Sequence, residues 1–120
     1  MILVDTSVWV DHLRSGNATL AKELEAGRVL AHPLVIGELA CGTIRNRREV
    51  LGLLRRLPSV PTATHAEALE FLERGALMGR GIGFVDVHLL ASAALAAPAR
   101  LWTRDRRLAA VATELALAYA

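Results

Sequence analysis

The sequence predicts an α/β fold, with a central, mostly parallel sheet of four to five strands and helices on both of its faces. Two observations lead to this prediction. Short, mostly apolar runs at 2–4, 28–31 and 101–103 are typical of buried strands. The longer segments between them repeat apolar residues at helical spacing, and such an alternation indicates a parallel sheet. At 120 residues without a linker or internal repeat, the chain is expected to form one domain, residues 1–120.

Local signals place the individual elements. Pro33 suits the first turn of a helix, and Thr64 followed by Glu67 forms a capping-box pattern. Weaker strands are expected at Val60 and at 117–119. The expected helices are a first one that begins after Asp5 and includes Val8, Trp9 and Leu13, and then 18–26, 34–44, 47–57, 64–78, 85–97 and 105–115.

The composition is apolar, with 53% hydrophobic residues, yet the pattern excludes a membrane span. The longest stretch with few charges begins at Gly81 and is interrupted by Asp86 and His88, whereas a transmembrane helix needs roughly 20 apolar residues. The first residues lack the basic region and apolar core of a signal peptide. The single cysteine, Cys41, has no disulfide partner, which favours a reducing compartment. We therefore expect a soluble, cytoplasmic protein with Cys41 as a small buried side chain.

Basic residues are unevenly distributed. The 14 Lys and Arg residues against 12 Asp and Glu residues give a net charge of +2, and all but Lys22 are arginines. Two clusters stand out, one formed by Arg45, Arg47, Arg48, Arg55 and Arg56 and the other by Arg104, Arg106 and Arg107. Either the clusters are solvated helix faces, or their guanidinium groups bind phosphate. In the second case, the cluster near the C-terminus is expected to contact the substrate.

Four acidic residues lie in apolar or strand-terminal surroundings: Asp5, Glu38, Asp86 and Asp105. Each also has a purely structural explanation. Asp5 and Asp105 suit helix N-caps, and Asp86 suits the first turn of a helix. Glu38, in apolar company, would need an arginine such as Arg45. Asp5 and Asp105, however, both follow strands, and the carboxyl ends of parallel strands form the ligand-binding edge of such sheets.

Four carboxylates gathered at one edge would repel one another. Two charges about 4 Å apart cost about 4 kcal/mol at an effective dielectric near 20. Mg²⁺ and Mn²⁺ prefer carboxylate oxygens, and no pairing of Cys and His indicates zinc. An acidic Mg²⁺ or Mn²⁺ site beside clustered arginines favours hydrolysis of a phosphodiester bond.

Several of these segments together resemble the PIN-domain family. The resemblance covers the whole chain and rests on four motifs: Ile2-Leu3-Val4-Asp5-Thr6-Ser7-Val8, Gly37-Glu38-Leu39, Gly83-Phe84-Val85-Asp86 and Thr103-Arg104-Asp105-Arg106-Arg107-Leu108. The most similar subgroup is the VapC-type toxins of toxin–antitoxin pairs. One departure is Leu108, which stands where many members carry Phe.

The resemblance implies a Mg²⁺- or Mn²⁺-dependent endoribonuclease. It further implies a homodimer and inhibition by a VapB-type antitoxin protein. The family's acidic quartet matches Asp5, Glu38, Asp86 and Asp105, and its hydroxyl positions match Thr6 or Ser7, and Thr103. These hydroxyls would orient a carboxylate or a metal-bound water.

Two other functions remain open. A PIN-like module without catalysis could bind RNA or a protein, although all four acids are present. A phosphatase could use Asp5 as a nucleophile, although such enzymes place a second Asp where this chain has Ser7. Near the acids, Trp9 is expected to pack in the core, His88 to pack or to lie at the surface, and Asp11 to be solvated.

Overall fold

The computed structural model describes residues 1–119 and contains a three-stranded parallel sheet in the order β2-β1-β3. The strands are β1 (Ile2–Val4), β2 (Val29–Leu30) and β3 (Arg100–Trp102). Leu3 in the central strand pairs with Leu30 on one side and Leu101 on the other. All residues of β1 are buried, as expected for a strand covered on both faces. The predicted parallel α/β architecture is confirmed.

The expected four to five strands are wrong, because the described residues form three. Single parallel bridges stand where the weak outer strands were expected: one joins Ala31 to Ser59, and the other joins Leu101 to Ala118. The first cannot lengthen because Pro58 and Pro61 have no N–H groups to donate to a neighbouring strand.

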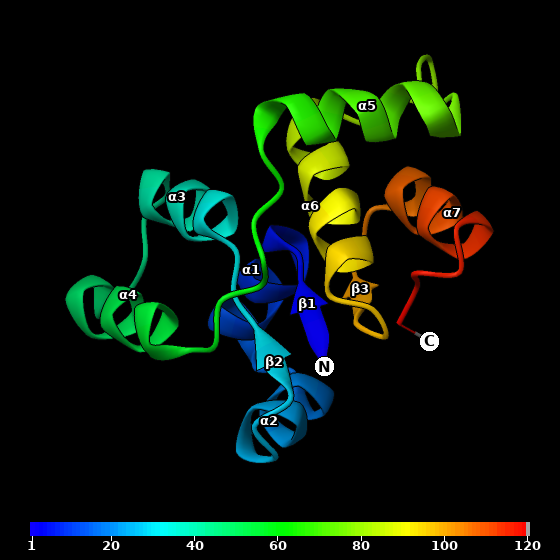
Figure 1. The fold of residues 1–120 in the computed structure, drawn as a ribbon. Helices are drawn as coiled ribbons and strands as arrows, with labels where there is room; N and C mark the ends of the chain where they lie inside the picture. The colour runs from blue at the N-terminus through cyan, green and yellow to red at the C-terminus, as the bar shows by residue number, and fades with distance from the viewer. Residues whose placement is uncertain (120) are drawn as a thin grey trace.

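Seven helices surround the sheet in the described part of the chain, in the positions that the sequence predicts. Figure 1 shows α6 against the sheet and α5 crossing α6. The helices α3 and α5 end earlier than expected, because Gly42 is extended and Ala76 is left-handed (φ 50°). Their bounds are α1 (Thr6–Ser15), α2 (Ala18–Glu25), α3 (Pro33–Cys41), α4 (Arg47–Arg56), α5 (His65–Gly75), α6 (Phe84–Leu95) and α7 (Arg106–Glu114).

One hydrophobic core joins the sheet to the helices. Its fully buried side chains include Leu3, Leu89, Leu90 and Leu101, which come from β1, α6 and β3. Trp9 is 4% exposed and belongs to the same core, which confirms a packing role. Within residues 1–119, no helix has both the length and the apolar character needed to cross a membrane.

A buried polar contact joins α3 to α6. His32 is fully buried at the N-cap of α3, and its Nδ1 accepts a hydrogen bond from the Leu34 N–H at 3.0 Å. The imidazole proton is therefore on Nε2, which lies 3.2 Å from the Ser92 hydroxyl oxygen of α6. That oxygen also accepts from the Ala63 N–H at 3.1 Å. Burial and the nearby charge of His88 lower the pKa of His32 from 6.5 to about 4.

This histidine predicts a pH-dependent stability. Between pH 6.5 and about 4 the unfolded chain binds a proton at His32 that the folded protein does not. The free energy of unfolding should therefore decrease as the pH falls through this window, and His32 should account for about 3 kcal/mol of the decrease. Urea titrations across the window should show this loss in the wild type, whereas His32→Asn should have a flatter profile. The exposed His65 provides the control, because His65→Gln should keep the wild-type slope; equal slopes in wild type and His32→Asn would contradict the prediction.

Candidate active site

The structure brings the four acidic residues to the carboxyl-terminal edge of the sheet and its neighbouring helices. Asp5 directly follows β1, and Asp105 comes shortly after the adjacent strand β3. Asp86 lies in the first turn of α6, and Glu38 lies on α3. Their proximity has an electrostatic consequence, because each of the other three acids acts on the ionisation of Asp86.

Hydroxyl groups hold the carboxylate of Asp5. It is 7% exposed, and its Oδ2 accepts hydrogen bonds from Ser7 Oγ and Thr103 Oγ1, both at 2.8 Å. Although Asp5 occupies the N-cap position of α1, its side chain makes no capping hydrogen bond. Its carboxylate is therefore committed to the hydroxyl pair, and capping does not explain why an acid stands here.

The same two hydroxyls fix the turn between β3 and α7. Ser7 Oγ accepts from the Arg104 N–H at 3.0 Å, and Thr103 Oγ1 accepts from the Asp105 N–H at 3.0 Å. The start of α1 is thereby tied to the loop that carries Asp105. Thr103 and Ser7 therefore contact Asp5, whereas Thr6 contacts Glu38. The expected supporting hydroxyls thus serve two different acids.

Glu38 is that other acid. Thr6 Oγ1 donates to Glu38 Oε1 at 2.6 Å, which links α1 to α3. The expected apolar surroundings of Glu38 are wrong, because its side chain is exposed on α3. The proposed ion pair with Arg45 is also absent among residues 1–119. An exposed carboxylate is hydrated and needs no buried partner, which is the physical reason for the difference.

Asp86 lies partly buried in the first turn of α6. Burial raises the pKa of Asp86, and the negative charges of the neighbouring acids raise it further. The Gly83 N–H opposes this rise by donating to Asp86 Oδ2 at 2.9 Å. The ionised form is thus costly without a cation nearby.

Asp105 is exposed and caps α7. Its Oδ1 accepts from the N–H groups of Arg107 and Leu108 at 2.9 and 3.0 Å, so the structural explanation from the sequence holds for this residue. In the described structure these bonds engage only one of its two carboxylate oxygens. Asp105 can therefore cap the helix and present its other oxygen to the site.

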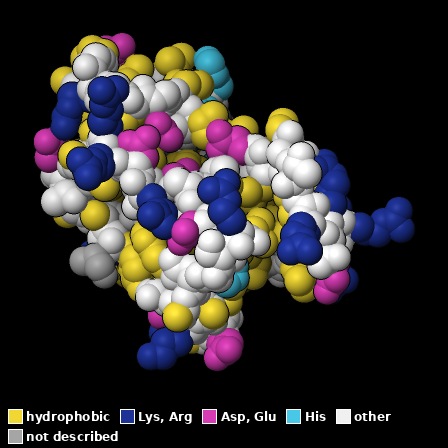
Figure 2. Space-filling model, turned by 180° about the vertical axis from the view of Figure 1, so that it is seen from behind, with side chains coloured by type: hydrophobic (Ala, Val, Ile, Leu, Met, Phe, Trp, Pro, Cys, Tyr) yellow, Lys and Arg dark blue, Asp and Glu magenta, His cyan; other side chains and the backbone are white. Residues whose placement is uncertain are grey.

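No basic side chain among residues 1–119 forms an ion pair with any of the four acids. Arg104 pairs instead with Asp11 of α1, at 2.8 Å, so the expectation of a merely solvated Asp11 is wrong. A sequence signal existed, because Asp11 lies four residues after Ser7 and therefore on the same helix face. Arg106 and Arg107 are exposed. Figure 2 shows acidic side chains near the middle of one face, with basic side chains to either side.

The donor set suits a hard divalent cation in chemistry, because it consists of carboxylate oxygens whose charge is not compensated by arginine. As the side chains are placed, no three His, Cys, Asp or Glu residues of the described chain are close enough to hold an ion between them. Four carboxylates without a cation repel one another, and rotation of exposed side chains such as Glu38 and Asp105 would be needed to gather them.

Two further sequence expectations concern cysteine and histidine. Cys41 is exposed at the end of α3, so its expected burial is wrong. The apolar residues around it mislead because α3 turns only part of its surface to the core. His88 packs edge-on against Phe84 at a centroid distance of 4.7 Å, as a packing role predicts, and its buried Nδ1 has no partner among the described residues.

Comparison with known proteins identifies the class. The PIN domain family model matches residues 2–114, and the chain therefore belongs to the PIN domain family. Over 120 residues the chain is 52% identical to Ribonuclease VapC32 of Mycobacterium tuberculosis (strain CDC 1551 / Oshkosh), a match that spans all of this chain and 97% of that protein. Ribonuclease VapC32 of strain ATCC 25618 / H37Rv gives the same identity and coverage. The resemblance to VapC-type toxins is confirmed.

The raised pKa of Asp86 predicts the effect of neutralising this residue. A carboxyl whose pKa is raised on folding contributes stability at low pH that is lost as the pH rises through its folded pKa. At pH 7 in EDTA, Asp86→Asn should therefore raise the melting temperature, because the amide carries no charge that burial and the neighbouring acids oppose. Glu73→Gln, on the exposed face of α5, is the matched control and should leave it unchanged. If the melting temperature of Asp86→Asn is equal to or below the wild-type value, the charge of Asp86 does not destabilise the folded protein and the prediction is wrong.

Proposed function

We propose that this protein is a Mg²⁺- or Mn²⁺-dependent endoribonuclease that acts as the toxin of a VapBC-type toxin–antitoxin pair. The observation that carries the proposal is the group of four acids at the sheet edge. Burial and the charges of the other three acids raise the pKa of Asp86, and no basic side chain of the described chain forms an ion pair with any of the four. Repulsion between carboxylates lowers the stability of the fold, and a bound divalent cation would relieve it. The full-length similarity to a protein named a ribonuclease supports RNA as the substrate.

In this proposal Asp5, Asp86 and Asp105 hold the metal ion, and Glu38 holds a second ion or positions the attacking water. A bound divalent cation supplies an activated water and stabilises charge that develops on the phosphate. Ser7 and Thr103 fix one oxygen of Asp5, which leaves Oδ1 free of hydrogen bonds from the described residues.

The remaining residues of the proposed site either hold Glu38 or bind the substrate. Thr6 holds Glu38 through one carboxylate oxygen, and the other stays available for water or a cation. Arg104, Arg106 and Arg107 are exposed beside the acids, where guanidinium groups can bind RNA phosphates. Asp11 keeps Arg104 near the site through their ion pair.

The proposed partners are a VapB-type antitoxin and a second copy of this chain. Exposed apolar side chains, among them Leu53, Met78 and Leu95, provide surface that such contacts would cover. The proposed location is the cytoplasm, because the exposed free thiol of Cys41 suits a reducing compartment.

Neutralising one proposed metal-binding carboxylate should strongly reduce the rate of cleavage. We expect wild-type protein with Mg²⁺ or Mn²⁺ to cut single-stranded RNA internally, and Asp5→Asn to reduce the rate by about 100-fold or more, since the charge of one proposed ligand is lost. Ser7→Ala should have a smaller effect of about 10–100-fold, because it only loosens the ligand. The assay is gel analysis of a labelled RNA, with EDTA as the metal-free control and Glu73→Gln as the protein control.

Other outcomes of this assay would identify the alternatives. RNA binding without cleavage under any metal would indicate a silent binding module. Metal-dependent release of phosphate from a monoester, with intact RNA, would indicate a phosphatase that uses Asp5 as nucleophile. Equal RNA cleavage by wild type and Asp5→Asn would contradict the proposed active site.

Metal binding should also stabilise the folded protein. An ion that binds only the folded state raises stability by about 2.7 kcal/mol at one hundred times its dissociation constant. Differential scanning fluorimetry should show a rise of several degrees with millimolar Mn²⁺, and Asp5→Asn should lose it. A rise of the same size in Asp5→Asn would place the ion elsewhere.

A further inference from the structure

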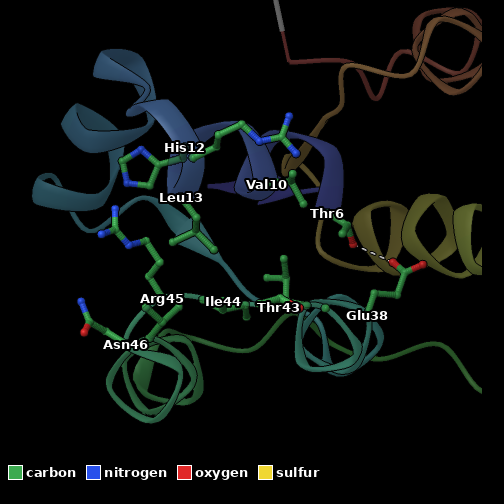
Figure 3. Close-up of a pocket in the computed structure, with 13 residues that line it drawn as sticks. Thr6, Val10, His12, Leu13, Glu38, Thr43, Ile44, Arg45 and Asn46 are labelled. Atoms are coloured by element: carbon green, nitrogen blue, oxygen red, sulfur yellow. Dashed lines mark hydrogen bonds between the residues drawn. The ribbon is translucent and has the colours of Figure 1, made fainter.

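A groove lies beside the acidic site. It has a volume of about 820 Å³ and runs between α1, α3 and the segment that connects α3 to α4. In Figure 3, Thr6 and Glu38 stand at one end, and Arg45 and Asn46 stand at the other. The groove therefore begins at the proposed active site and leads away from it.

The middle of the groove is apolar. Val10 and Leu13 of α1 face Ile44 across it, and Val10 is 39% exposed. A nucleobase or ribose has apolar faces that can rest on such a surface, whereas its polar edges can remain in water. The size of the groove is within the range that binds compact ligands.

Two arginines give the groove a positive charge. Arg14 of α1 and Arg45 both line it, both are exposed, and neither forms an ion pair or hydrogen bond with another described residue. The acid among the lining residues is Glu38, at the end that the proposed metal occupies. A nucleic-acid strand carries a phosphate on every nucleotide. One phosphate could lie at the acidic end with the proposed metal, and the next could be bound by the guanidinium groups of Arg14 and Arg45 beyond the apolar floor.

We propose that this groove binds single-stranded RNA on one side of the scissile phosphate, with a base or ribose on the apolar floor and a phosphate held by Arg14 and Arg45. The inference rests on the proposed function and extends it, because it assigns a substrate-binding surface outside the acidic centre. Binding should therefore depend on RNA length. A dinucleotide has a single phosphate, which would lie at the acidic site, and it has no second phosphate for Arg14 and Arg45 to bind.

The first test measures binding without cleavage. In an Asp5→Asn background, in which cleavage is slowed, fluorescence anisotropy of a labelled 12-nucleotide single-stranded RNA gives the dissociation constant as a function of salt. Arg14→Ala and Arg45→Ala should each weaken binding about tenfold and reduce the slope of log K against log salt by about 0.7, the value for one lost phosphate contact on a single strand. Arg48→Ala is the matched control, because Arg48 is also exposed but does not line the groove.

The second test fills the groove without changing charge. Val10→Trp places a large side chain over the apolar floor. In the active protein it should lower kcat/KM for the 12-nucleotide RNA about tenfold and leave cleavage of a dinucleotide unchanged. Circular dichroism and the melting temperature of each variant confirm that the fold is kept.

The outcomes separate this inference from the proposed function. If the wild type cleaves RNA and the three groove variants bind and cut the longer RNA as the wild type does, the groove assignment is wrong. If these variants lose binding to a purified antitoxin protein but keep RNA binding, the groove is a protein site and the assignment is again wrong. If no RNA is cleaved while the arginine variants still lose RNA binding, the groove assignment stands and the nuclease function falls.

Discussion

The parallel pairing of β1 with β3 determines the geometry of the site. Because the two strands run in the same direction, the residues that follow them, Asp5 and Asp105, leave the sheet at the same edge. The first turn of α6 adds Asp86, and α3 adds Glu38, so negative charge gathers at the edge. Burial and these charges together raise the pKa of Asp86. Hydroxyl and backbone N–H groups hold these acids in place in the described structure, and arginine does not pair with them.

Hydroxyl groups suit this role because they orient a carboxylate without neutralising it. Ser7 and Thr103 both donate to the same oxygen of Asp5, and each also accepts a backbone N–H from the turn before α7. A guanidinium in their place would form an ion pair and compete with a cation for the carboxylate. The arrangement keeps the charge available and fixes its position.

The order of the strands and helices could be predicted because it depends on local signals. The capping box at Thr64 and Glu67 forms as expected. The nearly apolar sequence of α6 predicts a central helix, and six of its residues are buried. The number of strands could not be predicted in the same way. A bridge at Ser59 and a full strand have similar local sequences, and the difference lies in how many N–H groups the neighbouring prolines leave for pairing.

The sequence by itself determined the α/β class, the four acids and the family, since these follow from residue types and their order along the chain. The tertiary structure decided which hydroxyl holds which acid, that Glu38 is exposed, and that Arg45 lines a groove instead of pairing with Glu38. These features depend on distances between residues on different elements, and such distances follow from the packing of α1 and α3 around β1. An apolar helix such as α3 gives no periodic signal of which face will meet water, so only its packing could place Glu38.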